Sequence, residues 1–343
     1  MQILRALRRQ IDRLGGRPQA TAGRRKAATA EPGAAASLQN ATADTYVVKG
    51  RAKAALEVPR SAAPVSAMRE PSINWHGDVE VKRSRFGVHG GARFLTDGST
   101  MMVAKWAPTL EHEILAYHLA AHLGLPTPFL RVESRPAKQL RALLGSGDAP
   151  VMLMRHLPGH SFAELVAQDE KHIKGSQGPQ GPLHDLGRLA AFDYLLQNQD
   201  RFPLEGLEGN NPGNLMLSAG KVHGIDHTLP RLVADVETQR YRKTLATALK
   251  LLRDPAHAEA EACLRGLVDF FPKHWGLSWE AIRGDVVAGF VQQAHRIGRM
   301  SDAELRRLFQ VTKKHKPLKR DLEDLLIGHL GIFRDASVAG GAL

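Results

Sequence analysis

The sequence predicts an α+β chain of two lobes, in which a small antiparallel sheet with one helix precedes a larger helical body. Residues 79 to 105 alternate in hydrophobicity and contain Asp97-Gly98, a dipeptide typical of β-hairpin turns. From residue 238 to residue 330, apolar residues recur almost throughout at helical spacing. Strands that come before a run of helices are typical of this fold class.

The elements between these ends follow from local signals. The run TLEHEILAYHLAAHL predicts a helix, which Gly124 and Pro126 end. The remaining expected elements are a strand at 79–82, a buried strand at 151–154, a helix over 185–199 and a hairpin at 216–223 around Gly220.

The first 70 residues differ in composition from the rest of the chain. They hold 13 Lys and Arg against 5 Asp and Glu, a surplus of +8 out of the total net charge of +12. They are rich in Ala, Gly, Pro, Ser and Thr, so we expect residues 1–70 to be largely disordered. Tyr46 to Val48 is the one short patch expected to order. Met1 to Leu14 predicts a basic amphipathic helix, with export, membrane-surface binding, organelle targeting and no targeting role as open alternatives.

Composition narrows the class of protein. A hydrophobic fraction of 43% is enough for a real core, and no apolar run is long enough for a transmembrane helix. The lone Cys263 favours a reducing compartment or a fold that needs no disulfide. Because residues 71–343 carry a net charge of only +4 (+12 less +8), nucleic acid is not the expected partner.

A glycine-rich segment and a strand-end lysine are the first candidate site residues. Gly87, Gly90 and Gly91 lie between two expected strands, where backbone N–H groups could approach a phosphate. Lys105 ends the apolar strand MMVAK, so its stem would be buried and its ammonium aimed at a partner. The alternatives are ordinary turn glycines and a solvated edge lysine.

The helix that follows supplies an acid to orient such a lysine. Glu113, which precedes the apolar run of this helix, is the preferred partner and Glu111 the second choice. Either could instead be an acid favoured by the helix dipole. His118 and His122 lie four residues apart without a metal-site motif, so we expect ordinary packing roles for them.

The segment NQDRFPLEGLEGNNPGNLMLSAGKVHGIDH carries the strongest pattern. Asp200 follows a helix end and precedes Arg201, Asn214 opens a strand, and Asp226 ends the strand that returns. A hairpin places its outer ends side by side, which would bring Asn214 and Asp226 together around one Mg²⁺. Asp200 could accept a proton from an attacking hydroxyl. Caps and surface acids are the alternative interpretation.

The order of these residues resembles the protein kinase-like fold over roughly residues 78 to 230. The motifs NQDR, NPGNLM and GIDH are more similar to its atypical branch, which includes the actin-fragmin kinase catalytic domain, the phosphatidylinositol 3-/4-kinases and bacterial toxin kinases. The helix EILAYHLAAHLGLPTP is also similar to the actin-fragmin kinase group. The resemblance implies an N-lobe at 73–157, a helical C-lobe at 158–335 and a flexible tail at 336–343.

The resemblance also implies roles for single residues. Lys105 would bind the phosphates of ATP together with the glycine loop, with Glu113 holding the lysine. Met154 to Leu157, including His156, would be the hinge against adenine. Asp200 would be the catalytic base, with Arg201 and Lys105 as further catalytic residues, and Asn214 and Asp226 would hold Mg²⁺. The remaining acid, Asp193, would brace the catalytic loop or lie exposed.

Three features depart from the family pattern. The spacing from Asp200 to Asn214 is long, GVHGG differs from G-x-G-x-x-G, and His227 stands where kinases with a D-F-G motif have Phe. In the D-F-G motif, the Phe and Gly after the Asp mainly switch the kinase between its active and inactive states. Their absence here suggests an enzyme that is constitutively active.

The function expected from the sequence is an ATP- and Mg-dependent atypical Ser/Thr protein kinase that acts as a monomer. A bacterial effector exported into a host cell, with a host protein such as a cytoskeletal component as substrate, is one hypothesis, and a cytoplasmic enzyme is the other. A lipid kinase whose basic segment 313–321 faces headgroups, a nucleotide-binding pseudokinase and an AMP-transferring protein remain alternatives.

Overall fold

The computed structural model describes most of the chain beyond residue 72. The described residues are 45–48 (backbone only), 73–74, 78–83, 92–106, 110–133, 138–145, 149–167, 181–198, 200–201, 211–227, 229, 235–275, 277–314, 318 and 320–341. The expected helix at 1–14, the glycine loop with Gly87, Gly90 and Gly91, and residues 202–210 lie outside them, so the expectations for these segments stay predictions.

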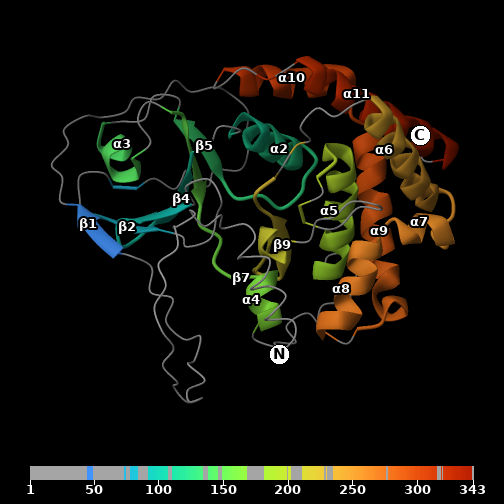
Figure 1. The fold of residues 1–343 in the computed structure, drawn as a ribbon, viewed down its shortest axis with the longest axis horizontal. Coiled ribbons are helices and arrows are strands. Elements are labelled where there is room, and N and C mark those ends of the chain that lie inside the picture. Colours follow the sequence, from blue (N-terminus) through green and yellow to red (C-terminus); the bar gives the residue numbers. More distant parts are fainter. Residues whose placement is uncertain are drawn as a thin grey trace, which may run out of the picture.

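An antiparallel sheet forms the first lobe (Figure 1). Its six described strands are ordered β1-β2-β3-β4-β6-β5, with β5 and β6 exchanged relative to the chain. They are β1 (Thr45–Val48), β2 (Val79–Arg83), β3 (Arg93–Thr96), β4 (Met101–Lys105), β5 (Leu130–Glu133) and β6 (Val151–Arg155). At the β3–β4 turn, the Asp97 carboxylate accepts hydrogen bonds from the N–H groups of Ser99 (2.9 Å) and Thr100 (2.8 Å). The Asp97-Gly98 hairpin is therefore confirmed.

Helices cover both faces of this sheet because successive strand residues point to opposite sides. On one face, Ala104 and Leu153 pack in a cluster with Leu140 and Leu143 of α3 (Lys138–Leu144). On the other face, Met152 and Met154 pack with α2 (Leu110–His122). Lys105 lies opposite Met152 in the β4–β6 register, so its side chain belongs to the face that α2 covers.

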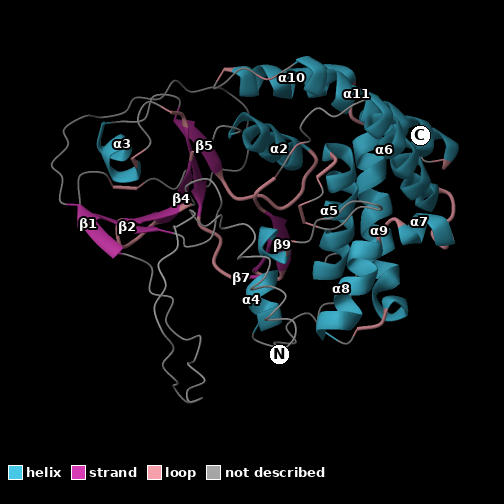
Figure 2. Cartoon of the chain, in the orientation of Figure 1, coloured by secondary structure: helices cyan, strands magenta, loops and turns pink. Residues whose placement is uncertain are grey.

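The second lobe is mainly helical (Figure 2). Its helices are α4 (Phe162–Ala167), α5 (Pro182–Leu196), α6 (Asp235–Ala248), α7 (Ala258–Ala262), α8 (Arg265–Trp275), α9 (Trp279–Gly298), α10 (Asp302–Lys313) and α11 (Arg320–Ala339), with 3-10 turns at Pro212–Asn214 and Leu249–Leu252. A small sheet joins β7 (His160–Ser161), β8 (Leu215–Ser218) and β9 (Lys221–Gly224). None of the helices in the described ranges is long and apolar enough to cross a membrane.

Helices α5 and α9 form the centre of this lobe. Two glycines let their backbones approach, since a Cβ on Gly187 would lie 1.9 Å from the Val286 carbonyl oxygen and one on Gly289 would lie 2.0 Å from that of His184. Such contacts exclude any larger residue unless the helices separate. The close approach sets α5 firmly on α9, and α5 leads directly into the segment that carries Asp200.

The predicted α+β fold of two lobes is confirmed: a small antiparallel sheet with α2 precedes a helical body. The strand at 79–82, the helix ended by Gly124, the buried strand at 151–154 and the hairpin around Gly220 are all present. Strand β5, strand β7 and helix α4 were not expected, because each is short. Helix α11 continues to Ala339, which corrects the expected start of the tail at 336.

Side chains from two other helices complete the C-terminal end of α5. The Tyr241 hydroxyl of α6 donates to the carbonyl of Tyr194 at 2.5 Å, and Nδ1 of His329 in α11 lies 2.9 Å from the carbonyl of Leu195. Carbonyls in the last turn of a helix have no partner within the helix. These two contacts therefore satisfy buried groups directly before the Asp200 segment.

Stability should fall as the pH drops from about 6.5 toward about 4, in part through His329. Burial, together with the nearby Arg242, lowers the pKa of His329 from 6.5 to about 4. In that window the unfolded chain takes up a proton that the folded chain does not, which costs up to about 3 kcal/mol. His329→Gln can still donate to Leu195 and cannot titrate, so urea unfolding at pH 7.5 and 4.5 should show a smaller loss for the variant. Equal losses in both proteins would contradict this account.

Candidate active site

Lys105 connects the two lobes. Its Nζ lies 3.0 Å from Oε1 of Glu113 in the first turn of α2, and it also contacts Oδ1 of Asp226 beyond β9. The lysine side chain is mostly buried, and Asp226 is half-buried. The structure thus brings together three residues expected from separate segments of the sequence. Glu113, the preferred of the two acids, is the one that pairs with Lys105.

Asp200 and Asn214 meet across the long insert. The Asn214 side-chain amide donates to Oδ2 of Asp200 at 2.6 Å, and the Asn211 N–H donates to the Asp200 carbonyl at 2.8 Å. The ends of the insert are therefore adjacent, and the chain returns to the point at which it left. The Ile225 N–H then donates to the Asn214 carbonyl at 2.9 Å, which places Asn214 beside the residue that precedes Asp226.

The environment of Asp200 favours proton acceptance. Burial raises the pKa of this carboxyl, while the hydrogen bond from Asn214 and the charge of Arg201 lower it. The net direction is upward from the ordinary value. A carboxylate with a raised pKa is a stronger base and remains partly exposed here, so it can meet an incoming hydroxyl.

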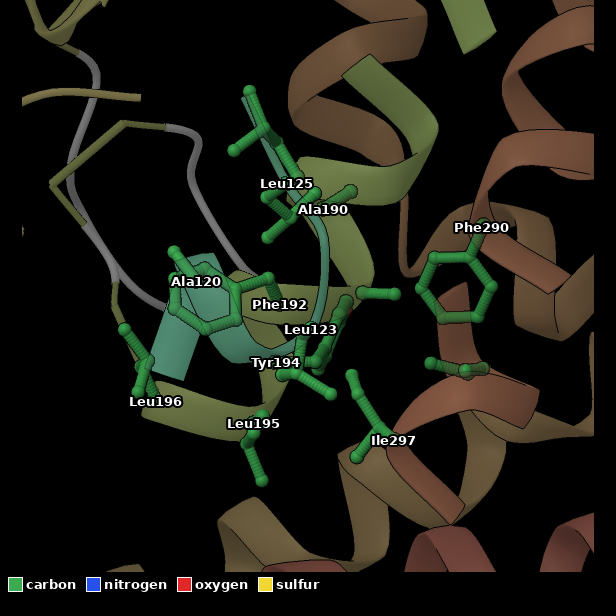
Figure 3. Packing of buried hydrophobic residues seen from close by; sticks show 14 of the residues in the cluster. Ala120, Leu123, Leu125, Ala190, Phe192, Tyr194, Leu195, Leu196, Phe290 and Ile297 are labelled. Atoms are coloured by element: carbon green, nitrogen blue, oxygen red, sulfur yellow. The ribbon is translucent and has the colours of Figure 1, made fainter. Parts of the chain in front are cut away.

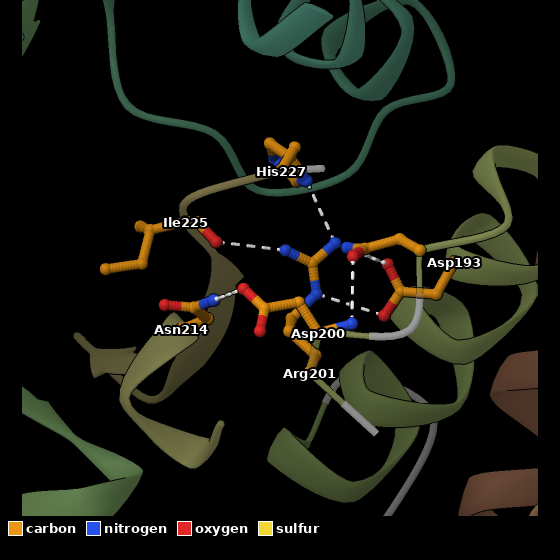
Figure 4. Close-up of polar contacts among 7 residues, drawn as sticks. Asp193, Asp200, Arg201, Asn214, Ile225 and His227 are labelled. Atoms are coloured by element: carbon orange, nitrogen blue, oxygen red, sulfur yellow. Dashed lines mark hydrogen bonds and ion pairs between the residues drawn. The ribbon is translucent and has the colours of Figure 1, made fainter. Parts of the chain in front are cut away.

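Arg201 is completely buried and makes polar contacts on three sides (Figure 4). Its guanidinium forms a two-pronged ion pair with Asp193, with Nε to Oδ2 at 3.0 Å, and donates to the Ile225 carbonyl at 3.0 Å. The Nη2 nitrogen, which also forms the second contact with Asp193, lies 2.9 Å from Nδ1 of His227. This burial and these contacts are those of a positioning residue, and the catalytic role expected for Arg201 stays a prediction. Asp193 braces the loop, the first of its two expected alternatives.

Two buried polar residues were not expected in this network. The Asn198 amide donates to Oδ1 of Asp193 at 3.1 Å, and its carbonyl oxygen accepts from the Asp200 N–H at 3.2 Å. His227 is neutral, because burial and the nearby Arg201 and Lys105 hold its pKa well below the usual value. Its Nδ1 therefore accepts a hydrogen bond from Arg201. The polar pair Gln197-Asn198 after an apolar helix is the only sequence signal for Asn198.

The residues expected at the adenine hinge lie at the end of β6. The Met154 side chain is buried among α2 residues. The His156 N–H donates to the Met101 carbonyl at 3.0 Å, and its half-buried ring meets Phe94 edge-on with centroids 5.8 Å apart. These contacts fix the chain as it leaves the sheet. Contact with adenine stays a prediction for both residues.

The donors around Asp226 fit a hard divalent cation. Asn214 and Asp226 present amide and carboxylate oxygens at neighbouring strand ends, with Asp200 beside them, and no sulfur or imidazole ligand is needed. Among the described residues, no group of three or more His, Cys, Asp and Glu forms a ready metal site. Phosphate oxygens and water would therefore complete the shell. Asp226 has φ 53°, a left-handed conformation that is uncommon outside glycine and often found at functional sites.

A comparison with solved structures finds a kinase and phosphotransferases at low sequence identity and low TM-scores. The kinase CtkA of Helicobacter pylori shows 13% identity and a TM-score of 0.38, covering 76% of this chain and 95% of that chain. The aminoglycoside phosphotransferase APH(4)-Ia, a thermostable mutant in complex with AMP-PNP and hygromycin B, shows 13% identity and a TM-score of 0.25, covering 76% and 94%. A third structure, from Ralstonia eutropha JMP134, is assigned as an aminoglycoside phosphotransferase. It shows 13% identity and a TM-score of 0.24, and the match covers 75% of this chain and 94% of that chain.

These values are too low to transfer an activity to this chain. No family model and no curated protein sequence matches it. The expected likeness to the actin-fragmin kinase group is not among these findings and stays a prediction.

We expect the buried ion pair between Arg201 and Asp193 to fix the geometry of the site while adding little to the free energy of unfolding. Asp193→Ala leaves a buried, unpaired guanidinium, and we expect the free energy of unfolding to fall by about 3–5 kcal/mol. Asp193→Leu combined with Arg201→Met removes both charges and should recover most of that loss in urea unfolding. Greater instability in the double variant than in Asp193→Ala would contradict this interpretation.

Proposed function

We propose that the chain is an ATP- and Mg²⁺-dependent phosphotransferase that moves the terminal phosphoryl group of ATP to a hydroxyl. One observation carries the proposal. Lys105, from the sheet, is paired with Glu113 and touches Asp226, while Asn214 joins the same corner to Asp200. A cationic group, hard oxygen ligands and a candidate base thus converge from both lobes. Phosphoryl transfer depends mainly on such positioning and charge neutralisation.

Each residue has a distinct role in this proposal. Lys105 binds phosphate oxygens, and Glu113 holds the ammonium in place. Asn214 and Asp226 hold Mg²⁺, which when bound neutralises charge on the phosphates. Asp200 accepts the proton of the attacking hydroxyl, and its hydrogen bond from Asn214 fixes the carboxylate. Arg201, Asp193 and Asn198 touch no substrate. They hold the loop that carries Asp200 in its position.

The acceptor we propose is a Ser or Thr hydroxyl of a protein. The supporting feature is the contact between Asp200 and Asn211, which places both ends of the insert beside the candidate base. A host protein reached after export is the specific form of this proposal, and the basic N-terminal segment is its support. Binding of that segment to a membrane surface is the related proposal for its location.

Asp200→Asn separates chemistry from nucleotide binding. The variant keeps the shape of the side chain but cannot accept the proton, so we expect phosphoryl transfer to fall by about 10²- to 10⁴-fold. Binding of Mg²⁺·AMP-PNP should change little, because Lys105 and Asp226 remain. The measurement is label transfer from γ-³²P-ATP to lysate proteins or to phosphatidylinositol vesicles, together with calorimetric nucleotide binding.

The controls decide among the alternatives. Asp226→Asn should weaken nucleotide binding as well as transfer, whereas Glu259→Gln, on the exposed surface of α7, should change neither. Label on vesicles alone would favour a lipid kinase, and transfer from α-³²P-ATP would indicate AMP transfer. Nucleotide binding without transfer in the wild type would favour a pseudokinase. Each of these outcomes overturns the protein kinase proposal.

A further inference from the structure

Helix α2 is buried on two sides, and only one of them faces the sheet. Leu110, Ile114 and Tyr117 pack with the sheet residues Met152 and Met154. A different set of α2 side chains belongs to the large apolar core of the C-lobe: Leu115, Ala116, Leu119 and Ala120. Figure 3 shows Ala120 together with Leu123 and Leu125 beside side chains of α5 and α9. The helix that carries Glu113 is therefore part of the C-lobe core.

Two C-lobe side chains also hold the backbone at the end of α2. The amide of Gln293, buried in α9, donates to the Leu123 carbonyl at 3.2 Å. The guanidinium of Arg188 in α5 donates to the Gly124 carbonyl at 2.5 Å and to Oε1 of Gln293 at 3.3 Å. Gly124 has φ +64°, and a Cβ at this position would collide with the guanidinium of Arg296. The C-lobe thus supplies the partners that the last carbonyls of a helix lack.

Helix α10 adds a third contact from the C-terminal part of the chain. It lies against α2, as Figure 1 shows, and its Leu305 and Phe309 are buried in the same core. A capping box between Ser301 and Glu304 fixes its start. Oε1 of Glu304 also lies 3.7 Å from Nε2 of His122. This exposed pair contributes little, so the apolar contact is the important part.

Displacement of α2 from Lys105 would expose these apolar side chains, leave the buried Leu123 carbonyl without a partner and break the contact of Arg188 with the exposed Gly124 carbonyl. We propose that the C-lobe fixes α2 through Gln293, Arg188 and α10, so that Glu113 stays on Lys105 without an activating partner or modification. The inference rests on the proposed function, because the Lys105–Glu113 contact matters only if Lys105 binds phosphate. Gln293 and Arg188 are positioning residues in this account.

Hydrogen exchange tests the fixed helix without reference to activity. In the nucleotide-free full-length chain, the amides of α2 should exchange as slowly as those of α5, through global unfolding. Gln293→Met removes both hydrogen bonds of the amide and should speed exchange in α2 more than in α5. Faster exchange of α2 than of α5 in the wild type means that α2 opens by itself, and this result overturns the proposal.

Nucleotide affinity tests the positioning role. Gln293→Met should weaken Mg²⁺·AMP-PNP binding about 5- to 10-fold, mainly through loss of the buried hydrogen bond to the Leu123 carbonyl. In a Glu113→Gln background the same change should have almost no further effect, since the contact that it positions is already lost. Arg283→Met is the matched control, because Arg283 lies in the same helix as Gln293 but its guanidinium contacts Glu261 of α7 and donates to the Pro255 carbonyl at 3.0 Å. It should leave affinity unchanged. Fully additive effects of Gln293→Met and Glu113→Gln contradict the proposal.

A second variant keeps the test possible if the first one does not fold. If Gln293→Met does not fold, Gln293→Glu keeps an acceptor for Arg188 and removes only the donor to Leu123, so the same two measurements apply. A wild type that binds no nucleotide contradicts the proposed function, while exchange in α2 still decides the present inference. A wild type that binds nucleotide but has a separately opening α2 contradicts the present inference alone.

Discussion

The buried ion pair between Arg201 and Asp193 is the interaction on which the geometry of the site depends. It joins the last turns of α5 to the loop that carries Asp200, and the same guanidinium reaches the Ile225 carbonyl beside Asp226. A charge in this environment is costly unless every donor is satisfied. One arginine therefore fixes two segments at once: the candidate base on one and the candidate metal ligand on the other.

The second constraint comes from α2. In chain order this helix belongs to the first lobe, but its residues Leu115, Ala116, Leu119 and Ala120 are in the core of the second. Its first turn carries Glu113 toward Lys105 and its end is held by Gln293 and Arg188. The two lobes thus share this helix, whose first turn places Glu113 beside Lys105. The neutral His227, with its ring edge-on to Tyr117 of α2 at a centroid distance of 4.7 Å, connects this helix to the Arg201 network.

Sequence reasoning succeeded where local spacing decides the geometry. The juxtaposition of Asn214 with the end of β9 follows from hairpin geometry, and that of Lys105 with Glu113 follows from a strand end and the first turn of the next helix. It failed where packing between distant segments decides. Nothing near Arg201 in the sequence shows that its side chain is buried, since that depends on Asp193, Ile225 and His227 together. The four residues of β5 contain too little alternation to predict a strand.

The same limit applies to α2. Its apolar residues predict a helix with a buried side, but a repeat of 3.6 residues does not say which lobe covers each face. Gln293 and Arg188 lie more than 60 residues beyond the carbonyls that they hold. Only the tertiary structure assigns them a role.

The structure of the protein with Mg²⁺ and AMP-PNP tests the central claim most directly. The account predicts terminal phosphate oxygens within hydrogen-bonding distance of Lys105 Nζ, the cation on Asn214 and Asp226, and the Asp200 carboxylate facing the terminal phosphorus. A nucleotide bound elsewhere, or one that leaves Lys105 on Asp226 with no cation between the strand ends, would contradict it.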